Sequence, residues 1–371
     1  MAEGKRDQYA AAGVDYEILD RGKLSAQGLS RHTIELFRGD GANVVEASIG
    51  ESALVIDVGG SYIATLSEGL GTRNIVADAM RAITGRTYYD SMAWSTVATI
   101  ANDLATSGAR PLSINAFWAA GESEWFDDSE RVADLNTGWA NACIEIGARW
   151  GGGETQAIKG LVQPGRIVLG GSAIGVIDPK ERLLSGDRLQ EGDAILIAPS
   201  SGIHDNGLTL ARRLADSLPN GYRSKMSDGN MYGQALLEPS CQYSPVVQSV
   251  FASGADLHYA ANVTGHGWRK IMRGDRDDLR YRIDRIPEAQ PIFGFLQNEL
   301  QMGDEEAYGT FNMGAGYALF VAGKDVARAK SRVLRDTGIS LLHAGVVEKG
   351  PKEVIIRPKG ITYSASSLAV R

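Results

Sequence analysis

Six short stretches of the chain place carboxylates, amides, hydroxyls or imidazoles beside glycines, and these residue types could bind a phosphate and a metal ion. Glycine lets backbone N–H groups approach an anion closely, and carboxylate oxygens are the ligands that Mg²⁺ prefers. The combination predicts a phosphate and metal site better than it predicts a buried core. The stretches are "SEGLGTR" (67–73), "ANDLATSGARPL" (101–112), "GGGET" (151–155), "SSGIHDNG" (200–207), "NVTGHG" (262–267) and "TFNMGAG" (310–316).

The stretch "SSGIHDNG" is the most informative of the six. It follows the apolar run 194–198 and precedes the helical pattern "LTLARRLADSL", so a strand leads into a helix N-terminus. Such a terminus offers free N–H groups to a phosphate, and His204 is available for proton transfer or charge stabilisation. Asp205 or Asn206 could instead cap the helix and leave His204 on the surface, and periodicity leaves both interpretations open.

Three carboxylates, Glu68, Asp103 and Glu154, are candidate oxygen ligands, and each has a simpler explanation. Glu68 could pair with Arg73 across a hairpin loop that contains Gly69 and Gly71. Asp103 could lie on a solvated helix face, because neighbouring helical residues point about 100° apart. Glu154 could belong to a flexible turn, and residues beside the later glycines, such as Asn312, are individually more often turn residues.

The composition limits the class of protein. The chain has 371 residues, 43% of them hydrophobic, and a net charge of −7 with acidic and basic residues well mixed. Nucleic acid is therefore a disfavoured partner. We expect no membrane span, because no apolar stretch approaches the roughly 20 residues required, and we expect a cytoplasmic location. Two cysteines, Cys143 and Cys241, are too few for a disulfide scaffold or a four-thiolate metal site.

Strand and helix patterns alternate along the chain, which predicts a mixed α/β class with two domains, 1–178 and 179–371. The first 50 residues and the stretch 150–155 carry no clear pattern of their own. In the first domain we expect a hairpin over 51–73, helices over 91–105 and 129–148, and strands over 111–121 and 166–177. In the second we expect helices over 208–217, 243–253 and 324–336, a helix start at Trp268, strands over 257–267, 316–322 and 341–349, and one final strand after Gly350.

Taken in order, these stretches resemble the aminoimidazole ribonucleotide synthetase family, the phosphoribosylformylglycinamidine cyclo-ligases of purine biosynthesis. The resemblance runs from "YAAAGVDY" (9–16) to about Lys349 and also includes "LLEPS" (236–240), "PIFGFLQ" (291–297) and "EEAYGTFNMGAGYALFV" (305–321). It implies a two-domain α/β fold whose N-terminal sheet forms a barrel with its copy in a homodimer. It also implies ATP and Mg²⁺, with formylglycinamidine ribonucleotide converted through an iminophosphate to aminoimidazole ribonucleotide, ADP and phosphate.

The resemblance also implies roles for individual residues. Glu68, Asp103 and Glu154 would be metal or nucleotide-phosphate ligands, and His204 and Asn206 would hold the reacting amide oxygen or the transferred phosphoryl group. The remaining residues would meet the nucleotide (Gly69, Gly71, Thr72, Arg73 and Asn102) or shape the phosphoribosyl-substrate side (Thr264, Gly265 and Asn312).

The chain departs from the family pattern at several positions. The family's glycine loop reads Asp-Gly-Val-Gly-Thr-Lys, whereas this chain has Glu68 and Arg73 at its ends; Val168 replaces an aspartate and His266 a glycine. These departures keep open a diverged enzyme that phosphorylates another amide or phosphate acceptor, and a nucleotide-binding regulator without turnover. A selenophosphate-synthetase-like activity is disfavoured because no cysteine lies near the start, and the resemblance to thiamine-phosphate kinases is weaker.

Overall fold

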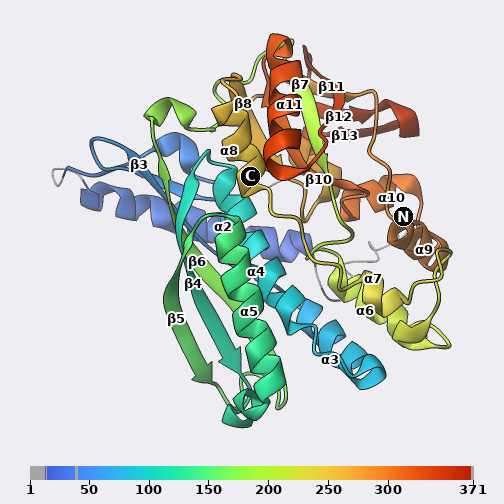
Figure 1. Cartoon of the computed structure of the whole chain (residues 1–371). Helices are drawn as coiled ribbons and strands as arrows, with labels where there is room; N and C mark the ends of the chain where they lie inside the picture. Colours follow the sequence, from blue (N-terminus) through green and yellow to red (C-terminus); the bar gives the residue numbers. More distant parts are fainter. Residues whose placement is uncertain (1–12, 14, 38–40, 369–371) are drawn as a thin grey trace.

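The computed structural model describes residue 13, residues 15–37 and residues 41–368, and it contains two sheets (Figure 1). The first sheet has the order β1-β2-β3-β6-β4-β5, and the second has the order β13-β12-β9-β11-β7-β10-β8. The strands of the first sheet are β1 (Asn43–Val44), β2 (Leu54–Asp57), β3 (Tyr62–Gly69), β4 (Arg110–Ala120), β5 (Arg149–Ala157) and β6 (Ile167–Ile177). Those of the second are β7 (Ala194–Pro199), β8 (Leu257–Asn262), β9 (Leu279–Ile283), β10 (Ala315–Val321), β11 (Leu342–Lys349), β12 (Glu353–Ile356) and β13 (Ile361–Ser364).

Helices α4 (Tyr89–Ala105) and α5 (Ser129–Glu145) cover one face of the first sheet (Figure 1). Alternate residues of β4 point toward these helices, as the period of two in a strand requires. Trp118 is buried and packs edge-on against Trp139 of α5, with ring centroids 5.5 Å apart. Its neighbour Phe117 points to the opposite face and is 41% exposed. The first sheet therefore has an inner face under the helices and an outer face, and this distinction decides where the site residues lie.

Two neighbouring strands of the second sheet, β10 and the edge strand β8, lie in the core. All residues of β8 and β10 are buried, so these strands read as continuous apolar runs instead of alternating ones. Helices α8 (Ser244–Ala252) and α11 (Val326–Thr337) contribute Val246, Val250, Ala329 and Val333 to one apolar cluster with these strands. The remaining helices of the second half are α6 (Leu208–Ser217), α7 (Tyr232–Ala235), α9 (Pro291–Leu300) and α10 (Asp304–Thr310).

Most predicted elements are confirmed within a few residues, and two expectations are wrong. "WGGGET" lies in the edge strand β5, which pairs parallel to β4. The chain after Gly350 forms two strands, β12 and β13, instead of one. The helix start predicted at Trp268 is confirmed within one residue, and this helix is the 3₁₀ helix η6 (Gly267–Met272). The hairpin over 51–73 is confirmed by β2 and β3, and helix α3 (Arg73–Thr84), which the sequence patterns do not predict, follows it.

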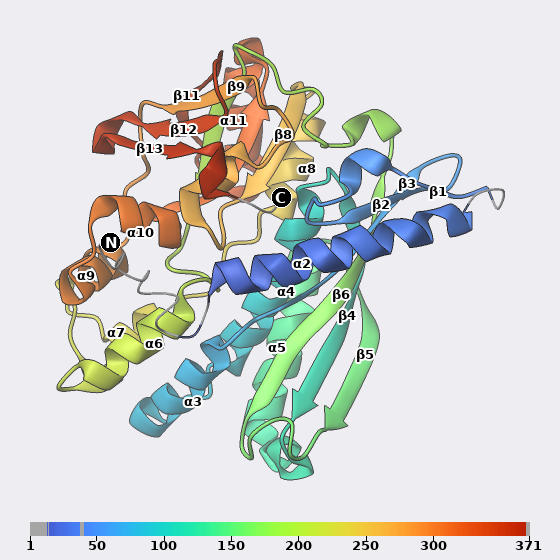
Figure 2. The ribbon, with the colours of Figure 1, turned by 180° about the vertical axis from the view of Figure 1, so that it is seen from behind.

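The early part of the chain also differs from the expectation of a loose pattern. Residues 16–30 form helix α2 (Tyr16–Ser30), which crosses the junction between the two sheets when the molecule is seen from behind (Figure 2). The buried Asp20 of this helix lies 3.6 Å from His266 Nε2. Residues 9–12 and 14 of the first family-like stretch lie outside the described residues. Among the described helices, none has the length and apolar character that a membrane span needs.

Two helical glycines provide a matched test of the packing between α4 and α5. A Cβ at Gly138 of α5 would lie 2.1 Å from the carbonyl oxygen of Asp90, whereas a Cβ at Gly294 of α9 would meet nothing within 4 Å. We expect Gly138→Ala to lower the free energy of unfolding by about 1–3 kcal/mol through overpacking. Gly294→Ala should raise it by about 0.5–1 kcal/mol, because alanine loses less backbone entropy in a helix. Urea unfolding monitored by circular dichroism measures both, and equal effects would contradict the packing argument.

Candidate functional site

The glycine loop ends at the N-terminus of α3 and leaves that terminus open to an anion. Gly71 has φ 74°, a left-handed conformation that suits glycine, and the loop turns there from β3 into the helix. Thr72 is the N-cap residue, and among the described residues its side chain accepts no hydrogen bond from the helix. The first turn of this 12-residue helix carries no acidic side chain. The N–H groups and the helix dipole together suit a phosphate group.

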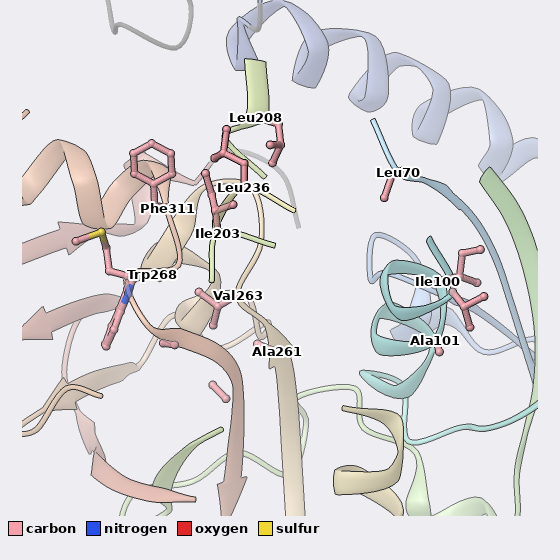
Figure 3. Close-up of a cluster of buried hydrophobic side chains, with 14 of the residues drawn as sticks. Leu70, Ile100, Ala101, Ile203, Leu208, Leu236, Ala261, Val263, Trp268 and Phe311 are labelled. Atoms are coloured by element: carbon pink, nitrogen blue, oxygen red, sulfur yellow. The ribbon is translucent and has the colours of Figure 1, made fainter. Parts of the chain in front are cut away.

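Five of the six polar stretches share one apolar support. A functional residue of each of these five lies next in sequence to a side chain of a single buried cluster: Leu70 beside Gly69, Ala101 beside Asn102, Ile203 beside His204, Val263 beside Thr264, and Phe311 beside Asn312. Figure 3 shows Leu70 and Ala101 from the first half of the chain and Ile203, Val263 and Phe311 from the second half. Packing of these neighbours fixes the loops relative to one another, so the site is built between the two sheets.

His204 is a buried neutral imidazole in a left-handed backbone conformation. Its φ is 56°, its side chain is 7% exposed, and burial lowers its pKa to about 4. The backbone N–H of Ser201 donates to His204 Nε2 at 3.2 Å. Nε2 must therefore be the acceptor nitrogen, and the ring proton resides on Nδ1. At neutral pH the imidazole can donate one hydrogen bond from Nδ1, but it is not a cation.

The amide of Asn312 supports the loop that carries His204. Asn312 Oδ1 accepts from Ser200 Oγ at 2.9 Å, and Asn312 Nδ2 donates to the carbonyl oxygen of Gly202 at 2.9 Å. The residue is 4% exposed, and Trp268 Nε1 donates to its carbonyl oxygen. The resemblance implied a place on the substrate side, but the structure uses the amide of Asn312 to fix the loop 200–203.

The loop 200–207 enters α6 in a way that excludes the capping alternative. Gly207 is the N-cap of α6 with φ 80°, and the carboxylate of Asp205 accepts from Arg73 instead of from the helix. A Cβ at Gly207 would lie 2.4 Å from the ring of Phe311, so a side chain would displace this contact. Asn206 precedes the cap and is half-buried at the entrance of the helix.

Glu68 and Asp103 lie on the same, inner side of the first sheet. Glu68 pairs with Gly171, where a Cβ would lie 3.0 Å from Ile100 of α4, and cross-strand partners share a face. Asp103 follows Ile100 by three residues on the same side of α4. Desolvation by surrounding protein atoms, followed by the charge of Asp103, raises the pKa of Glu68 to about 6. Asn262 Nδ2 donates to Asp103 Oδ1 at 2.7 Å and joins α4 to the second sheet.

Glu154 lies on the outer face, opposite Glu68. It pairs with Phe117, whose side chain points away from α4 and α5. Val168, which replaces the family's aspartate, is 46% exposed on the same outer face. The structure therefore separates the three carboxylates that the sequence grouped. Within the described part of the chain, no three His, Cys, Asp or Glu side chains gather into a potential metal site.

Arg73 and Asn102 occupy interior positions that differ from the expected contact with a nucleotide. Arg73 is fully buried, and it forms neither a surface pair with Glu68 nor an exposed charge. Asn102 is 4% exposed; its Nδ2 donates to the carbonyl oxygen of Cys241 at 2.8 Å, and its Oδ1 accepts from the N–H of Tyr243 at 2.6 Å. Both residues tie the first half of the chain to the segment 236–243.

The segment 262–270 brings a cation, Lys270, that sequence reasoning did not assign to the site. Thr264 accepts from the N–H of Gly267 at 2.9 Å through its carbonyl oxygen, and Gly265 lies between them in this tight turn. Burial and the neighbouring Lys270 ammonium lower the pKa of His266 to about 3. Burial and the charge of Arg273 lower the pKa of Lys270 to about 8, and the carboxylates of Asp103 and Glu68 oppose this shift. Lys270 carries no signal in the sequence beyond its place three residues after "TGHG".

Comparison with known proteins finds a family match for the part of the chain that forms most of the first sheet, and relatives that cover most of the whole chain. Residues 50–177 match the family model "AIR synthase related protein, N-terminal domain". A phosphoribosylformylglycinamidine cyclo-ligase of Methanothermobacter thermautotrophicus is 30% identical over 325 residues, covering 87% of this chain and 90% of the relative. One from Alkaliphilus oremlandii is 30% identical over 363 residues, covering 94% of this chain and 99% of the relative.

Solved structures show the same fold at lower identity. One chain of the crystal structure of the HypE–HypF complex aligns with a TM-score of 0.61 and 16% identity, covering 91% of this chain and 98% of that chain. Hydrogenase maturation protein HypE in complex with ATP aligns with a TM-score of 0.53 and 20% identity, covering 73% of this chain and 78% of that chain. These likenesses concern the fold. The identity and coverage of the curated relatives place this chain in the phosphoribosylformylglycinamidine cyclo-ligase family.

Proposed function

We propose that the protein is an ATP-dependent cyclo-ligase that converts formylglycinamidine ribonucleotide to aminoimidazole ribonucleotide, ADP and phosphate. The observation that carries the proposal is the meeting of two helix N-terminal loops, 69–73 and 200–207, which Arg73 and Asp205 join at 2.8 Å. One loop suits nucleotide phosphates and the other presents His204. The curated relatives that bear this activity in their names cover most of the chain.

The reaction requires an amide oxygen to become a leaving group. Transfer of the γ-phosphoryl group breaks its bond to the β-phosphate oxygen, releases ADP and forms a bond to the formyl oxygen of the substrate. Loss of the proton from the formamide nitrogen then gives the iminophosphate. The ribose-bearing amidine nitrogen then attacks the formyl carbon and loses its proton. Cleavage of the carbon–oxygen bond releases phosphate and closes the ring. Positioning and stabilisation of phosphate charge supply most of the catalysis in such a reaction.

Different residues of the chain would bind the nucleotide phosphate, the reacting oxygen and the phosphoribosyl substrate. The N–H groups at the start of α3 hold nucleotide phosphate, with Gly69, Gly71 and Thr72 forming the loop. His204 donates from Nδ1 to the reacting oxygen as a neutral imidazole, because its pKa of about 4 keeps it uncharged. Asn206 offers its amide beside it, and Thr264 with Gly265 borders the phosphoribosyl substrate. Lys270 adds a positive charge near Glu68 and Asp103.

A magnesium ion fits the inner pair of carboxylates. Mg²⁺ in nucleotide sites is usually held by one or two carboxylates, with phosphate oxygens and waters completing its octahedron. Glu68 and Asp103 would hold the ion. Desolvation, followed by the charge of Asp103, raises the pKa of Glu68, and a cation bound beside it would favour its ionised form. When bound, the ion neutralises phosphate charge. Glu154 of the same chain lies on the opposite face and does not join this pair.

Replacing Asp103 by asparagine tests the assignment of the metal ligands. Asparagine retains an oxygen that can accept from Asn262, so the link between the sheets is preserved while the charge is lost. We expect the Mg²⁺ concentration for half-maximal activity to rise about tenfold or more, because the ion loses one of two anionic ligands. A titration of activity against Mg²⁺ measures this, with Asp90→Asn, near the start of the same helix, as the control. An unchanged titration would remove Asp103 from the ligand set.

We also propose a domain boundary near residue 178, between the strands of the two sheets.

We further propose a homodimer in which a second copy covers the outer face of the first sheet. Phe117, Val168 and Ile174 are each more than 40% exposed on this face. Phe117 and Val168 line a hollow of about 610 Å³ together with Leu169 and Glu154. Contiguous exposed apolar surface of this kind marks an interaction site. Glu154 would then lie at the interface between the copies.

The direct test combines the purified protein with ATP, Mg²⁺ and formylglycinamidine ribonucleotide. ADP release and colorimetric detection of the aminoimidazole product are followed together, with the substrate omitted as the control. Product formed in step with ADP supports the cyclo-ligase. ADP without the aminoimidazole product would redirect the proposal to another acceptor, and ATP binding without ADP release would redirect it to a regulatory protein.

A further inference from the structure

Arg73 has an environment that is unusual for the last residue of a phosphate-binding loop. It is the first residue of α3, and its side chain is fully buried. All three nitrogens of its guanidinium donate hydrogen bonds. Nε donates to the carbonyl oxygen of Leu236 at 2.9 Å, and Nη2 donates to that of Glu238. The Nη1 group donates to Ser95 Oγ at 2.9 Å, Asp205 Oδ1 at 2.8 Å and Ser240 Oγ at 3.0 Å.

These contacts join four segments that are distant in the sequence. Arg73 comes from the glycine loop, Ser95 from α4, Asp205 from the loop that carries His204, and the remaining acceptors from the segment 236–240. The second carboxylate oxygen of Asp205 accepts from Thr99 Oγ1 at 3.0 Å and from Ser240 Oγ at 2.8 Å. Asp205 is therefore held at both oxygens, and its chain neighbours on either side are His204 and Asn206.

The shape of arginine explains why this residue replaces the family's lysine here. A guanidinium presents five N–H donors in a rigid planar fork, whereas a lysine ammonium presents three donors at one point. The acceptors around Arg73 lie on different segments, so a fork can reach them together. The charge is also balanced locally, because the only described carboxylate within ion-pair distance of Arg73 is that of Asp205, itself 7% exposed.

We infer that Arg73 is a positioning residue that holds His204 and Asn206 against the glycine loop through Asp205, and that it does not contact the nucleotide phosphate itself. The inference rests on the proposed function for its effect on turnover, but its structural part does not. The glycine loop and the His204 loop belong to different sheets, so the Arg73–Asp205 pair fixes the distance over which phosphoryl transfer would occur. A small change in that distance lowers the rate without removing any binding contact.

The test compares Arg73→Gln and Asp205→Asn with Arg81→Gln, a control on the same helix whose guanidinium pairs with Asp128 in a partly exposed position. We expect kcat to fall about 100-fold in the first two variants, the effect of a misplaced reacting group. The dissociation constant of a non-hydrolysable ATP analogue with Mg²⁺, measured by calorimetry, should stay within about threefold of wild type, because phosphate contacts remain. Arg81→Gln should change neither quantity.

A second readout separates positioning from loss of structure. The imidazole of His204 senses both partners, because the charge of Asp205 raises its pKa and that of Arg73 lowers it. In histidine-labelled protein followed by NMR, Arg73→Gln should raise the pKa of His204 from about 4 toward its ordinary value, whereas Asp205→Asn should lower it further. A purely structural role would lower the melting temperature and leave the folded protein's kcat unchanged.

The outcomes distinguish the two proposals. Loss of analogue affinity by tenfold or more with kcat retained would show that Arg73 meets phosphate and would overturn the inference. If Arg73→Gln does not fold, Asp205→Asn still tests the positioning role, because asparagine keeps the shape of the side chain and one accepting oxygen. If wild-type protein forms no aminoimidazole product, the proposed function fails, while the analogue affinity and the His204 titration continue to test the role of Arg73.

Discussion

Replacing His204 by asparagine is expected to lower kcat by about 100- to 1,000-fold, the range seen when one preorganised donor to a developing oxyanion is removed. His204 has φ 56°, and asparagine tolerates this left-handed conformation better than most residues do, so the backbone of the loop should be retained. The shorter amide cannot place a donor where the imidazole Nδ1–H lies. Steady-state kinetics with both ATP and the ribonucleotide substrate varied measure the change, and KM should change far less than kcat.

The control for this substitution is His343→Asn, in strand β11 of the second sheet, which should leave kcat unchanged. The pH dependence provides an independent check on the neutral state of His204. Because burial lowers its pKa to about 4, the folded protein should show no loss of activity from its protonation above pH 5. The unfolded chain takes up this proton near pH 6.5, so the contribution of His204 to stability is lost as the pH falls from 6.5 toward 4. A kcat that follows a group with pKa near 6.5 in wild type and not in His204→Asn would contradict this assignment.

The sequence predicts elements well where one periodicity dominates. The apolar spacing from Trp94 to Leu104 identifies α4, and the apolar run 167–177 identifies β6. Prediction from the sequence fails where tertiary contacts override the local conformational preference of a segment. β5 contains three consecutive glycines, and a Cβ at Gly153 would lie 2.0 Å from the carbonyl oxygen of Ala116. Close approach to β4, which a single sequence does not reveal, makes this glycine-rich segment a strand.

The sequence also predicts which loops form the site but not which side chains face it. Glycine beside polar residues marks all six stretches, because tight turns need that composition wherever they lie. The direction of a side chain depends on partners more than 90 residues away. Arg73 meets Asp205, Asn102 meets Tyr243, and Asn312 meets Gly202. Only the fold shows that these three polar residues hold the loops of the site in place through buried hydrogen bonds. It also shows that Glu154 lies on the face of the first sheet opposite Glu68 and Asp103.

The second large effect concerns the outer face of the first sheet. We expect the wild-type protein to have twice the mass of one chain in light scattering coupled to gel filtration, and Ile174→Asp to have the mass of a single chain. Ile174 is 43% exposed and points outward between Thr65 and Ser113, so aspartate can be hydrated in the separated chain. At a closed interface the same carboxylate would be buried without a partner, at a cost that several weak apolar contacts cannot offset.

A matched control makes this result specific to the sheet face. Ile144 is 76% exposed on α5, on the helical side of the same sheet, and Ile144→Asp introduces the same charge there. It should leave the mass at two chains, and circular dichroism should show that both variants fold. If Ile174→Asp remains a dimer while Ile144→Asp dissociates, the copies meet through the helices. Since the outer face carries Glu154 and the inner face carries Glu68 and Asp103, that outcome would also leave Glu154 outside any site shared between the copies.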